Sequence, residues 1–201
     1  MTAPIALELA VFDLDHTLLA GDSDHLWGEF LVESGHVDRD HYAAANQRFY
    51  EDYLAGTLDI QAFCRFALEP LTRLQPELLA QLQRQFVEQC IRPIVAPDAP
   101  ALLARHRAVR RHLLISTSTN RFVAAPIAKL LGIADLLATE PEFVDGRYTG
   151  RIAGVPNFQA GKVTRLKQWM AAQPQSFGAI HVYTDSRNDL PLLEAADHPV
   201  A

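Results

Sequence analysis

The most constraining feature of the sequence is an apolar run that ends abruptly in Asp13-Leu14-Asp15-His16-Thr17. Near-continuous apolar runs are typical of strands that are buried on both faces of a parallel sheet. We therefore predict a buried strand that ends in two carboxylates, at the edge where ligands bind in open α/β sheets. Asp is also common in turns, so the motif alone leaves a turn and an active site about equally open. The run contains Ile5, Leu7, Leu9, Val11 and Phe12.

From residue 98 onward, short apolar runs alternate with helical patterns, which favours an α/β fold with a doubly wound parallel sheet. An Asp-Gly pair between two short apolar runs also predicts a β-hairpin over residues 143–148. The predicted strands are 113–115, 136–138 and 180–183, and the predicted helices are 99–109, 122–131, 160–170 and 190–195.

Residues 20–93 show apolar side chains at helical spacing and no strand pattern, with Gly or Pro as stops. We therefore predict a small all-helical cap domain over 20–93, inserted into a core domain made of 1–19 and 94–201. Most cap aromatics are expected to form its interior. Trp27 and Phe30 are nearest in sequence to the acidic motif, so we expect these two to face a ligand.

Composition and charge exclude several classes of protein. The net charge of −6 argues against a nucleic-acid partner, because such surfaces are normally basic. No apolar stretch reaches the roughly 20 residues of a membrane helix, and the N-terminus lacks the pattern of a signal peptide. Cys64 and Cys90 are expected to be buried thiols, which fits a cytoplasmic location. The eight histidines show no zinc spacing, so we expect surface or cap roles for them.

Polar groups follow three predicted strands and open one helix, and parallel strands would bring all of them to one edge of the sheet. Such a set suits phosphoryl transfer through an aspartyl intermediate with Mg²⁺. The groups are Asp13 and Asp15, Ser116 and Thr117, Lys162, and Asp185 with Asp189.

Each of these groups has a chemical role in that interpretation. Asp13 and Asp185 supply the one or two carboxylates that Mg²⁺ usually takes alongside substrate phosphate. Lys162 and the Ser116 hydroxyl hold phosphate oxygens. Asp15 protonates the leaving alkoxide and then deprotonates the attacking water.

Taken together, the segments resemble the haloacid-dehalogenase-like (HAD) hydrolase superfamily, closest to the subgroup that includes phosphoserine phosphatase and carries a helical cap. The resemblance covers essentially the whole chain. It rests on the Asp13–Thr17 motif, Ser116, Gly161-Lys162, and Asp185-Ser186-Arg187-Asn188-Asp189.

The resemblance assigns roles to individual residues. It implies that Asp13 is the nucleophile and that Asp15 is the general acid/base, whose backbone carbonyl also binds Mg²⁺. It implies Asp185 as the second metal carboxylate and Asp189 as a residue that orders metal-bound water. The implied metal site is thus Asp13, Asp15, Asp185 and Asp189, and the implied phosphate-binding residues are Ser116, Thr117, Lys162 and Asn188.

Several positions depart from the phosphoserine phosphatase pattern. Asp22 stands where that group places a cap glutamate that reads the substrate amine, and Thr117 stands where it usually has Gly. No arginine is assignable to the substrate carboxylate; Arg48 and Arg65 are candidates, although a solvated helix face is the commoner role for such residues. Relatives usually continue through another strand and helix beyond Ala201, so the sequence leaves the native C-terminus open.

The leading hypothesis is a Mg²⁺-dependent phosphatase that acts on a small phosphomonoester. Asp22 and Asp24 suggest a substrate with an amine, such as phosphoserine or histidinol phosphate. A phosphotransferase or phosphomutase would use the same residues, and a non-catalytic ligand-binding protein is a further alternative. A dehalogenase is disfavoured, because a halide leaving group needs no proton from Asp15. The sequence does not specify the oligomeric state.

Overall fold

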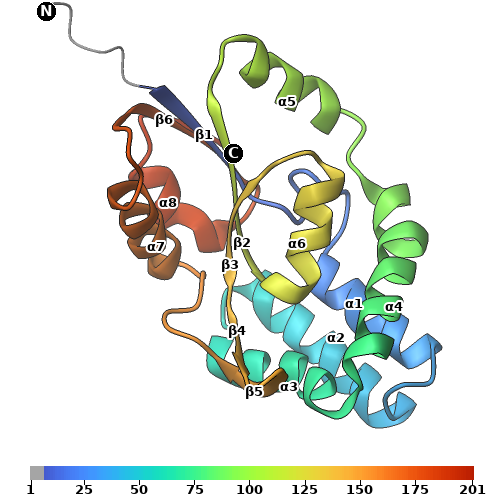
Figure 1. Ribbon diagram of the computed structural model, residues 1–201. Helices are drawn as coiled ribbons and strands as arrows, with labels where there is room; N and C mark the ends of the chain where they lie inside the picture. Colours follow the sequence, from blue (N-terminus) through green and yellow to red (C-terminus); the bar gives the residue numbers. More distant parts are fainter. Residues whose placement is uncertain (1–6) are drawn as a thin grey trace, which may run out of the picture.

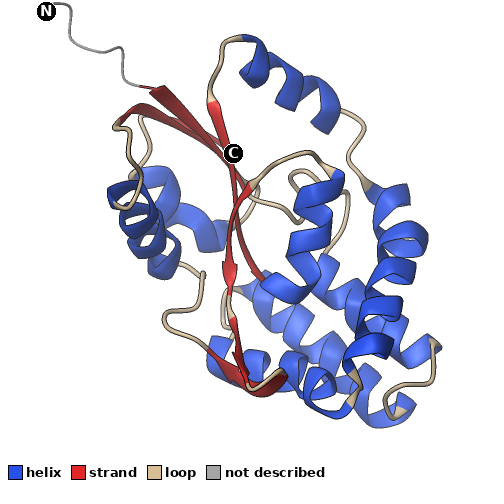
Figure 2. Cartoon of the chain, viewed as in Figure 1, coloured by secondary structure: helices blue, strands red, loops and turns tan. Residues whose placement is uncertain are grey.

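The computed structural model describes residues 7–201, which form a five-stranded sheet with helices on both faces (Figure 1; Figure 2). The strand order is β3-β2-β1-β6-β7, and every neighbouring pair is parallel. The predicted doubly wound α/β class is confirmed. The strands are β1 (Leu7–Phe12), β2 (His112–Asn120), β3 (Asp135–Thr139), β6 (Phe177–Tyr183) and β7 (His198–Val200). Ile5, which we expected in the first strand, lies outside the described residues.

β1 is the middle strand of the sheet, and its alternate side chains point to opposite faces. Leu9 and Val11 belong to a cluster on the face covered by α7 (Ala160–Ala171) and α8 (Leu190–Glu194). Ala10 and Phe12 belong to the larger cluster on the other face, where α5 (Ala99–Ala108) and α6 (Arg121–Leu130) lie. In Figure 1 the sheet separates these two layers of helices.

The register of the sheet aligns the ends of three strands. Phe12 pairs with Ile115 of β2 on one side and with Tyr183 of β6 on the other. The next residues, Asp13, Ser116 and Thr184, therefore lie at the same level, although β2 itself continues beyond Ser116. The Asp13 amide donates to the Tyr183 carbonyl at 2.8 Å, so the prediction that these strand ends meet at one edge is correct.

Four helices follow β1, as predicted: α1 (Ser23–Glu33), α2 (Arg39–Ala55), α3 (Ile60–Arg73) and α4 (Pro76–Phe86). Asp22, Asp38 and Asp59 cap the first three of them, each accepting from backbone N–H groups of the first turn. After α4 come a π-helical turn (Val87–Ile91) and a 3₁₀ turn (Arg92–Ile94).

Two predicted boundaries are wrong. Pro70 does not stop α3, because the turn that follows buries Leu71 in the hydrophobic cluster, which offsets the lost backbone hydrogen bond. β2 does not stop at 115 but continues to Asn120, with a register shift against β3 after Ser116. β7 was not expected, because its three exposed residues show no apolar pattern.

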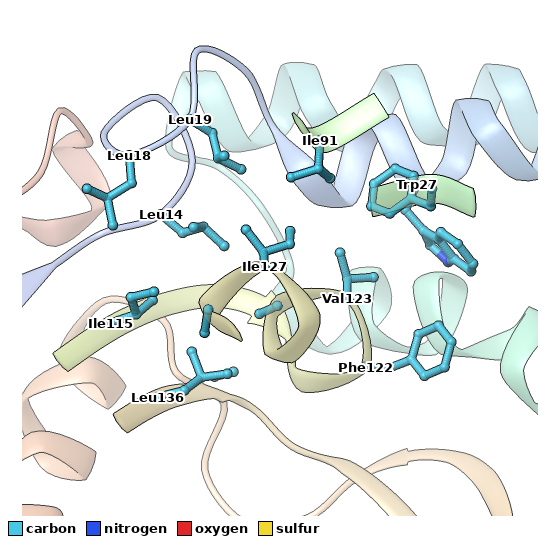
Figure 3. Close-up of a cluster of buried hydrophobic side chains, with 14 of the residues drawn as sticks. Leu14, Leu18, Leu19, Trp27, Ile91, Ile115, Phe122, Val123, Ile127 and Leu136 are labelled. Atoms are coloured by element: carbon cyan, nitrogen blue, oxygen red, sulfur yellow. The ribbon is translucent and has the colours of Figure 1, made fainter. Parts of the chain in front are cut away.

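Trp27 and Phe30 do not face a ligand, contrary to the expectation from their position in the sequence. They are 2% and 6% exposed. The Trp27 ring packs against Phe86 and against Phe122 of α6, with centroids 5.2 and 5.5 Å apart. Figure 3 shows Trp27 and Phe122 together with Leu14, Ile91 and Ile127 in one cluster. Helical spacing fixes which residues share a face, but not what that face meets.

The predicted hairpin is present as β4 (Pro141–Val144) and β5 (Arg147–Ile152), and it lies beside α3 (Figure 1). Asp145 and Gly146 turn it with φ values of 50° and 79°, the left-handed conformation that a two-residue hairpin loop requires.

Other predictions concern cysteines, histidines and membrane spans. Cys64 is a buried free thiol and Cys90 a half-buried one. His106 and His181 are buried beside the sheet, so the expectation of surface or cap roles is wrong for them. Among residues 7–201, no helix combines the length and apolar character that crossing a membrane requires.

Candidate active site

The site is built around Lys162, which is fully buried on the first turn of α7. Its Nζ donates to Oδ1 of Asp13 at 3.0 Å and to Oδ2 of Asp189 at 2.6 Å. Burial of a lysine is costly unless it is paired, and here two carboxylates flank it. Their charges outweigh the effect of burial and raise the pKa of Lys162, so the ammonium stays protonated.

Asp13 is buried at the end of β1, and its two carboxylate oxygens differ. Oδ1 is held by Lys162, while Oδ2 has only a long contact of 3.5 Å to the Thr184 hydroxyl. Burial raises the pKa of Asp13 to about 7, and the charge of Lys162 opposes that shift. The site therefore presents a desolvated carboxylate with one free oxygen.

Gly161 explains how Lys162 comes to its place. A Cβ atom at position 161 would lie 2.2 Å from the carbonyl oxygen of Pro156. Only a residue without a side chain allows this segment to pass so close, and the approach sets the start of α7.

Asp15 is held by two donors from different segments. The backbone N–H of Ser23 donates to Oδ1, and the Thr119 hydroxyl donates to Oδ2, both at 2.7 Å. Burial, with a smaller contribution from the charge of Asp22, raises the pKa of Asp15 to about 6, although both hydrogen bonds oppose the shift. A carboxyl that titrates near neutrality suits proton transfer.

Ser116 and Thr117 are both buried just beyond the pairing of β2 with β1. Asn157 Nδ2 donates to Ser116 Oγ at 3.1 Å and to the carbonyls of Thr117 and Leu137 at 2.9 and 3.0 Å. The Thr117 hydroxyl accepts from the Thr119 N–H at 3.2 Å. Asn157 thus fixes this segment of backbone, a role that no sequence pattern announced.

The residues of the last acidic motif form hydrogen bonds with several different segments of the chain. The Thr184 hydroxyl donates to Asp189 Oδ2 at 2.8 Å. Asp185 is exposed, and its Oδ1 accepts from the Thr17 hydroxyl at 3.3 Å, which links the first and last motifs. Asn188 Nδ2 donates to the Tyr53 carbonyl at 3.1 Å, so it contacts α2.

A cleft of about 430 Å³, counting its open mouth, lies beside Asp15 between the end of β2 and the helices α1, α2 and α3. Asp15, Asp22 and Asp24 line it, together with His25 and a group of aromatic side chains, Phe49, Tyr50, Tyr53 and Phe63. No Lys or Arg of the described residues lines it. Arg48 and Arg65 are exposed and do not line the cleft, so the structure does not support either as a reader of a substrate carboxylate.

The oxygen donors in this site fit a small hard cation. Within residues 7–201, no three His, Cys, Asp or Glu side chains gather around one point where a metal would bind. Mg²⁺ does not need such a group, because it usually takes one or two carboxylates and keeps several waters. The free oxygen of Asp13 and the exposed carboxylate of Asp185 match that requirement. Asp189 Oδ2 is already bound by Lys162 and Thr184.

Comparison with known proteins decides the family. The sequence matches the haloacid dehalogenase-like hydrolase family over residues 10–194. The chain belongs to this family. This HAD hydrolase is similar to a protein of Neisseria meningitidis serogroup C named histidinol-phosphatase. The two sequences are 44% identical over 96% of this chain and 89% of that relative.

Solved structures agree on the HAD fold. A Bordetella pertussis protein of unknown function is 41% identical, with a TM-score of 0.91 over 98% of this chain and 90% of that chain. A phospho-aspartyl intermediate analogue of phosphoserine phosphatase gives a TM-score of 0.72 at 15% identity, over 98% and 87% of the two chains. The predicted membership of a phosphatase subgroup of the HAD hydrolases is confirmed.

Proposed function

We propose that this HAD hydrolase is a Mg²⁺-dependent phosphatase that hydrolyses an amino-alcohol phosphate through an aspartyl-phosphate on Asp13. The observation that carries the proposal is the buried array in which Lys162 holds one oxygen of Asp13 and leaves the other free. Asp15, with its pKa near neutrality, stands two residues further along the same segment.

The residues divide the chemistry into two steps. In the first, the free carboxylate oxygen of Asp13 bonds to phosphorus, the ester P–O bond breaks, and Asp15 gives its proton to the leaving alkoxide. In the second, Asp15 takes a proton from water, the water oxygen bonds to phosphorus, and the Asp13 carboxylate is released. Bound Mg²⁺ would neutralise phosphate charge that otherwise repels the nucleophile.

Asp13 and Asp185 would hold the cation, with the Asp15 carbonyl as a further oxygen donor. Lys162 and the Ser116–Thr117 segment would bind phosphate oxygens. In place of the metal role expected for Asp189, we propose that this residue orients Lys162. The phosphate role of Asn188 stays a prediction, because its amide is bonded to the cap in this structure.

The cleft favours histidinol phosphate over phosphoserine. Phosphoserine carries a carboxylate, which would face Asp15, Asp22 and Asp24 with no Lys or Arg in the lining to pair with it. Histidinol phosphate carries an amine and an imidazole but no carboxylate. The 44% identity to a protein named histidinol-phosphatase supports the same choice.

The test is phosphate release from purified protein with histidinol phosphate, phosphoserine and p-nitrophenyl phosphate. We expect kcat/KM to be about 100-fold higher for histidinol phosphate than for phosphoserine, because the unpaired carboxylate is rejected. Asp13→Asn and EDTA should each abolish hydrolysis. Full activity in EDTA would refute the metal assignment, and transfer of phosphate to an added alcohol in preference to water would favour the phosphotransferase alternative.

A further inference from the structure

Asp24 is a cleft residue that the reaction steps above do not use. It lies in the first turn of α1, and its Oδ1 accepts from Asn120 Nδ2 at 2.8 Å. Asn120 is itself fixed, because its Oδ1 accepts from the Val123 N–H at 3.3 Å and caps α6. No donor from residues 7–201 reaches Asp24 Oδ2 in hydrogen-bond geometry. One oxygen is therefore anchored and the other is available to a ligand.

The other acids of the cleft are held differently. Both oxygens of Asp15 accept hydrogen bonds. Asp22 caps α1, with its Oδ1 accepting from the His25 N–H at 2.8 Å, so its second oxygen adds negative charge beside Asp24. Asp24 is half-buried, and burial raises its pKa well above the ordinary value, with the charges of Asp22 and Asp15 adding to the shift. A half-buried carboxylate that lies beside other acids and has no cationic partner costs free energy, which a cation from the ligand would remove.

The aromatic wall of the same cleft gives an independent indication of what the ligand looks like. The His25 ring stacks on Tyr50 with centroids 4.6 Å apart and planes 26° apart. Asn46 holds His25, since Asn46 Nδ2 donates to the His25 carbonyl at 2.9 Å. Asn46 can approach because residue 28 is glycine: a Cβ there would lie 2.6 Å from the Asn46 side chain. The wall is thus a preformed apolar surface that suits a flat ring or short carbon chain.

We propose that Asp24 determines which leaving group is accepted. Its free carboxylate oxygen binds the cationic end of the alcohol that leaves from the phosphate ester, and the carbon part of this alcohol packs against the wall formed by His25 and Tyr50. As a statement about catalysis this rests on the proposed phosphatase function, but the binding of the alcohol itself does not. The ligand class is a small alcohol with a protonated amine or imidazole and no carboxylate.

A kinetic test separates this role from a structural one. We expect Asp24→Asn to lower kcat/KM for histidinol phosphate by about 30-fold, mainly through KM, and for the uncharged leaving group of p-nitrophenyl phosphate by no more than about 3-fold. Asp24→Glu should restore part of the difference. Asp40→Asn is the matched control, because Asp40 also lies in the first turn of a helix, α2, but is exposed and does not line the cleft. Equal losses for the two substrates would overturn the proposal.

A binding test does not depend on turnover, and its first measurement uses the wild-type protein alone. Calorimetric titration of the wild-type protein should show histidinol binding at least about 10-fold more tightly than the neutral 3-phenylpropan-1-ol. Asp24→Asn should remove that preference. Equal affinity of the wild-type protein for the two alcohols would overturn the inference. A preference that depends on Asp24, in a protein that hydrolyses no phosphomonoester, would support the inference and refute the proposed function instead.

Discussion

Lys162 joins two carboxylates in a place that water does not reach, and its removal should be costly. Lys162→Met keeps an unbranched side chain that is one atom shorter, but it leaves Asp13 and Asp189 buried without a cation. Breaking a buried pair in this way typically costs about 3–5 kcal/mol. We expect the free energy of unfolding to fall by about that amount in urea denaturation with EDTA present, and phosphatase activity to be lost.

A second substitution identifies the cause of that loss. If the unpaired carboxylates are responsible, Asp189→Asn added to Lys162→Met should recover about 1–2 kcal/mol relative to the single variant. If the losses of stability from the two substitutions simply add, the methionine side chain packs poorly in the space that the Lys162 side chain fills.

Trp27 gives a prediction of a much smaller change in stability. Its indole Nε1 is buried and has no hydrogen-bond partner among the described residues. Trp27→Phe removes an unsatisfied donor while it keeps an aromatic ring against Phe86 and Phe122. We expect stability within about 1 kcal/mol of wild type, because the gain offsets part of the lost packing. We also expect an unchanged KM in the phosphatase assay; a raised KM would mean that this ring contacts substrate after all.

The residues that could be predicted are those that follow or open a recognisable strand or helix in the sequence. Asp13 and Asp15 follow a buried strand, and Lys162 opens a helix after a glycine. Thr119 and Asn157 could not be found in this way, because an ordinary hydroxyl and an ordinary amide carry no signal. Their importance arises from the path of the backbone after β2, which the sequence did not reveal.

The end of α2 contacts the segment 186–188, which belongs to the proposed active site. The Tyr53 hydroxyl donates to Ser186 Oγ at 3.2 Å, and the Tyr53 carbonyl accepts from Asn188. The same segment lies between Asp185 and Asp189. Tyr53 also lines the cleft, so a single residue contacts both the cleft and the segment 186–188.

Tyr53→Phe tests whether this contact contributes to catalysis. The substitution removes one hydrogen bond of roughly 0.5–1.5 kcal/mol and keeps the ring. We expect kcat/KM for the amino-alcohol phosphate to fall about 3–10-fold, with faster amide exchange at the C-terminal end of α2. Tyr42→Phe is the matched control on the same helix, because Tyr42 stacks on Phe66 and its hydroxyl makes no hydrogen bond within the described residues. A similar loss in both variants would contradict a specific role for Tyr53.

Helices and strands were predictable where periodicity and stop signals agree. The end of α2 at Gly56 is an example, since this glycine has a φ of 75°. Pro70 misled the prediction because burial of the next turn outweighs the helix-breaking effect of proline. The far end of β2 could not be predicted from Ser116-Thr117-Ser118-Thr119-Asn120, because polar residues in a strand mimic a loop.

Across the whole molecule, one hydrophobic cluster runs from β1 through α6 to α1 and α4. Figure 3 shows the part of it around Trp27, Phe122 and Ile127. The cap boundaries at residues 20 and 93 remain a prediction, and the cluster crosses both of them. If the cap opens to admit substrate, the parts with the fewest shared apolar contacts should move, rather than α1, whose Trp27 is packed on α6.

His106 connects the same sheet to the pH dependence of stability. It is 3% exposed, its Nε2 lies 3.0 Å from the Tyr183 hydroxyl, and its ring meets Phe12 edge-on. Burial lowers the pKa of His106 to about 4, and the positive charges of Arg111, His181 and Arg105 add to the shift, while Glu8 opposes it.

The sign of the effect follows from proton binding in the two states. An unfolded histidine takes up its proton near pH 6.5, whereas folded His106 does so only near pH 4, so acid favours unfolding between these values. We expect this contribution to be complete above pH 6.5 and to lower the Tm by roughly 2–4 °C between pH 6.5 and 5. His106→Gln should have a lower Tm at pH 7 and a shallower slope in that range. His41→Gln, on an exposed residue of α2, should keep the wild-type slope; a wild-type slope in His106→Gln as well would show that other groups govern the acid limb.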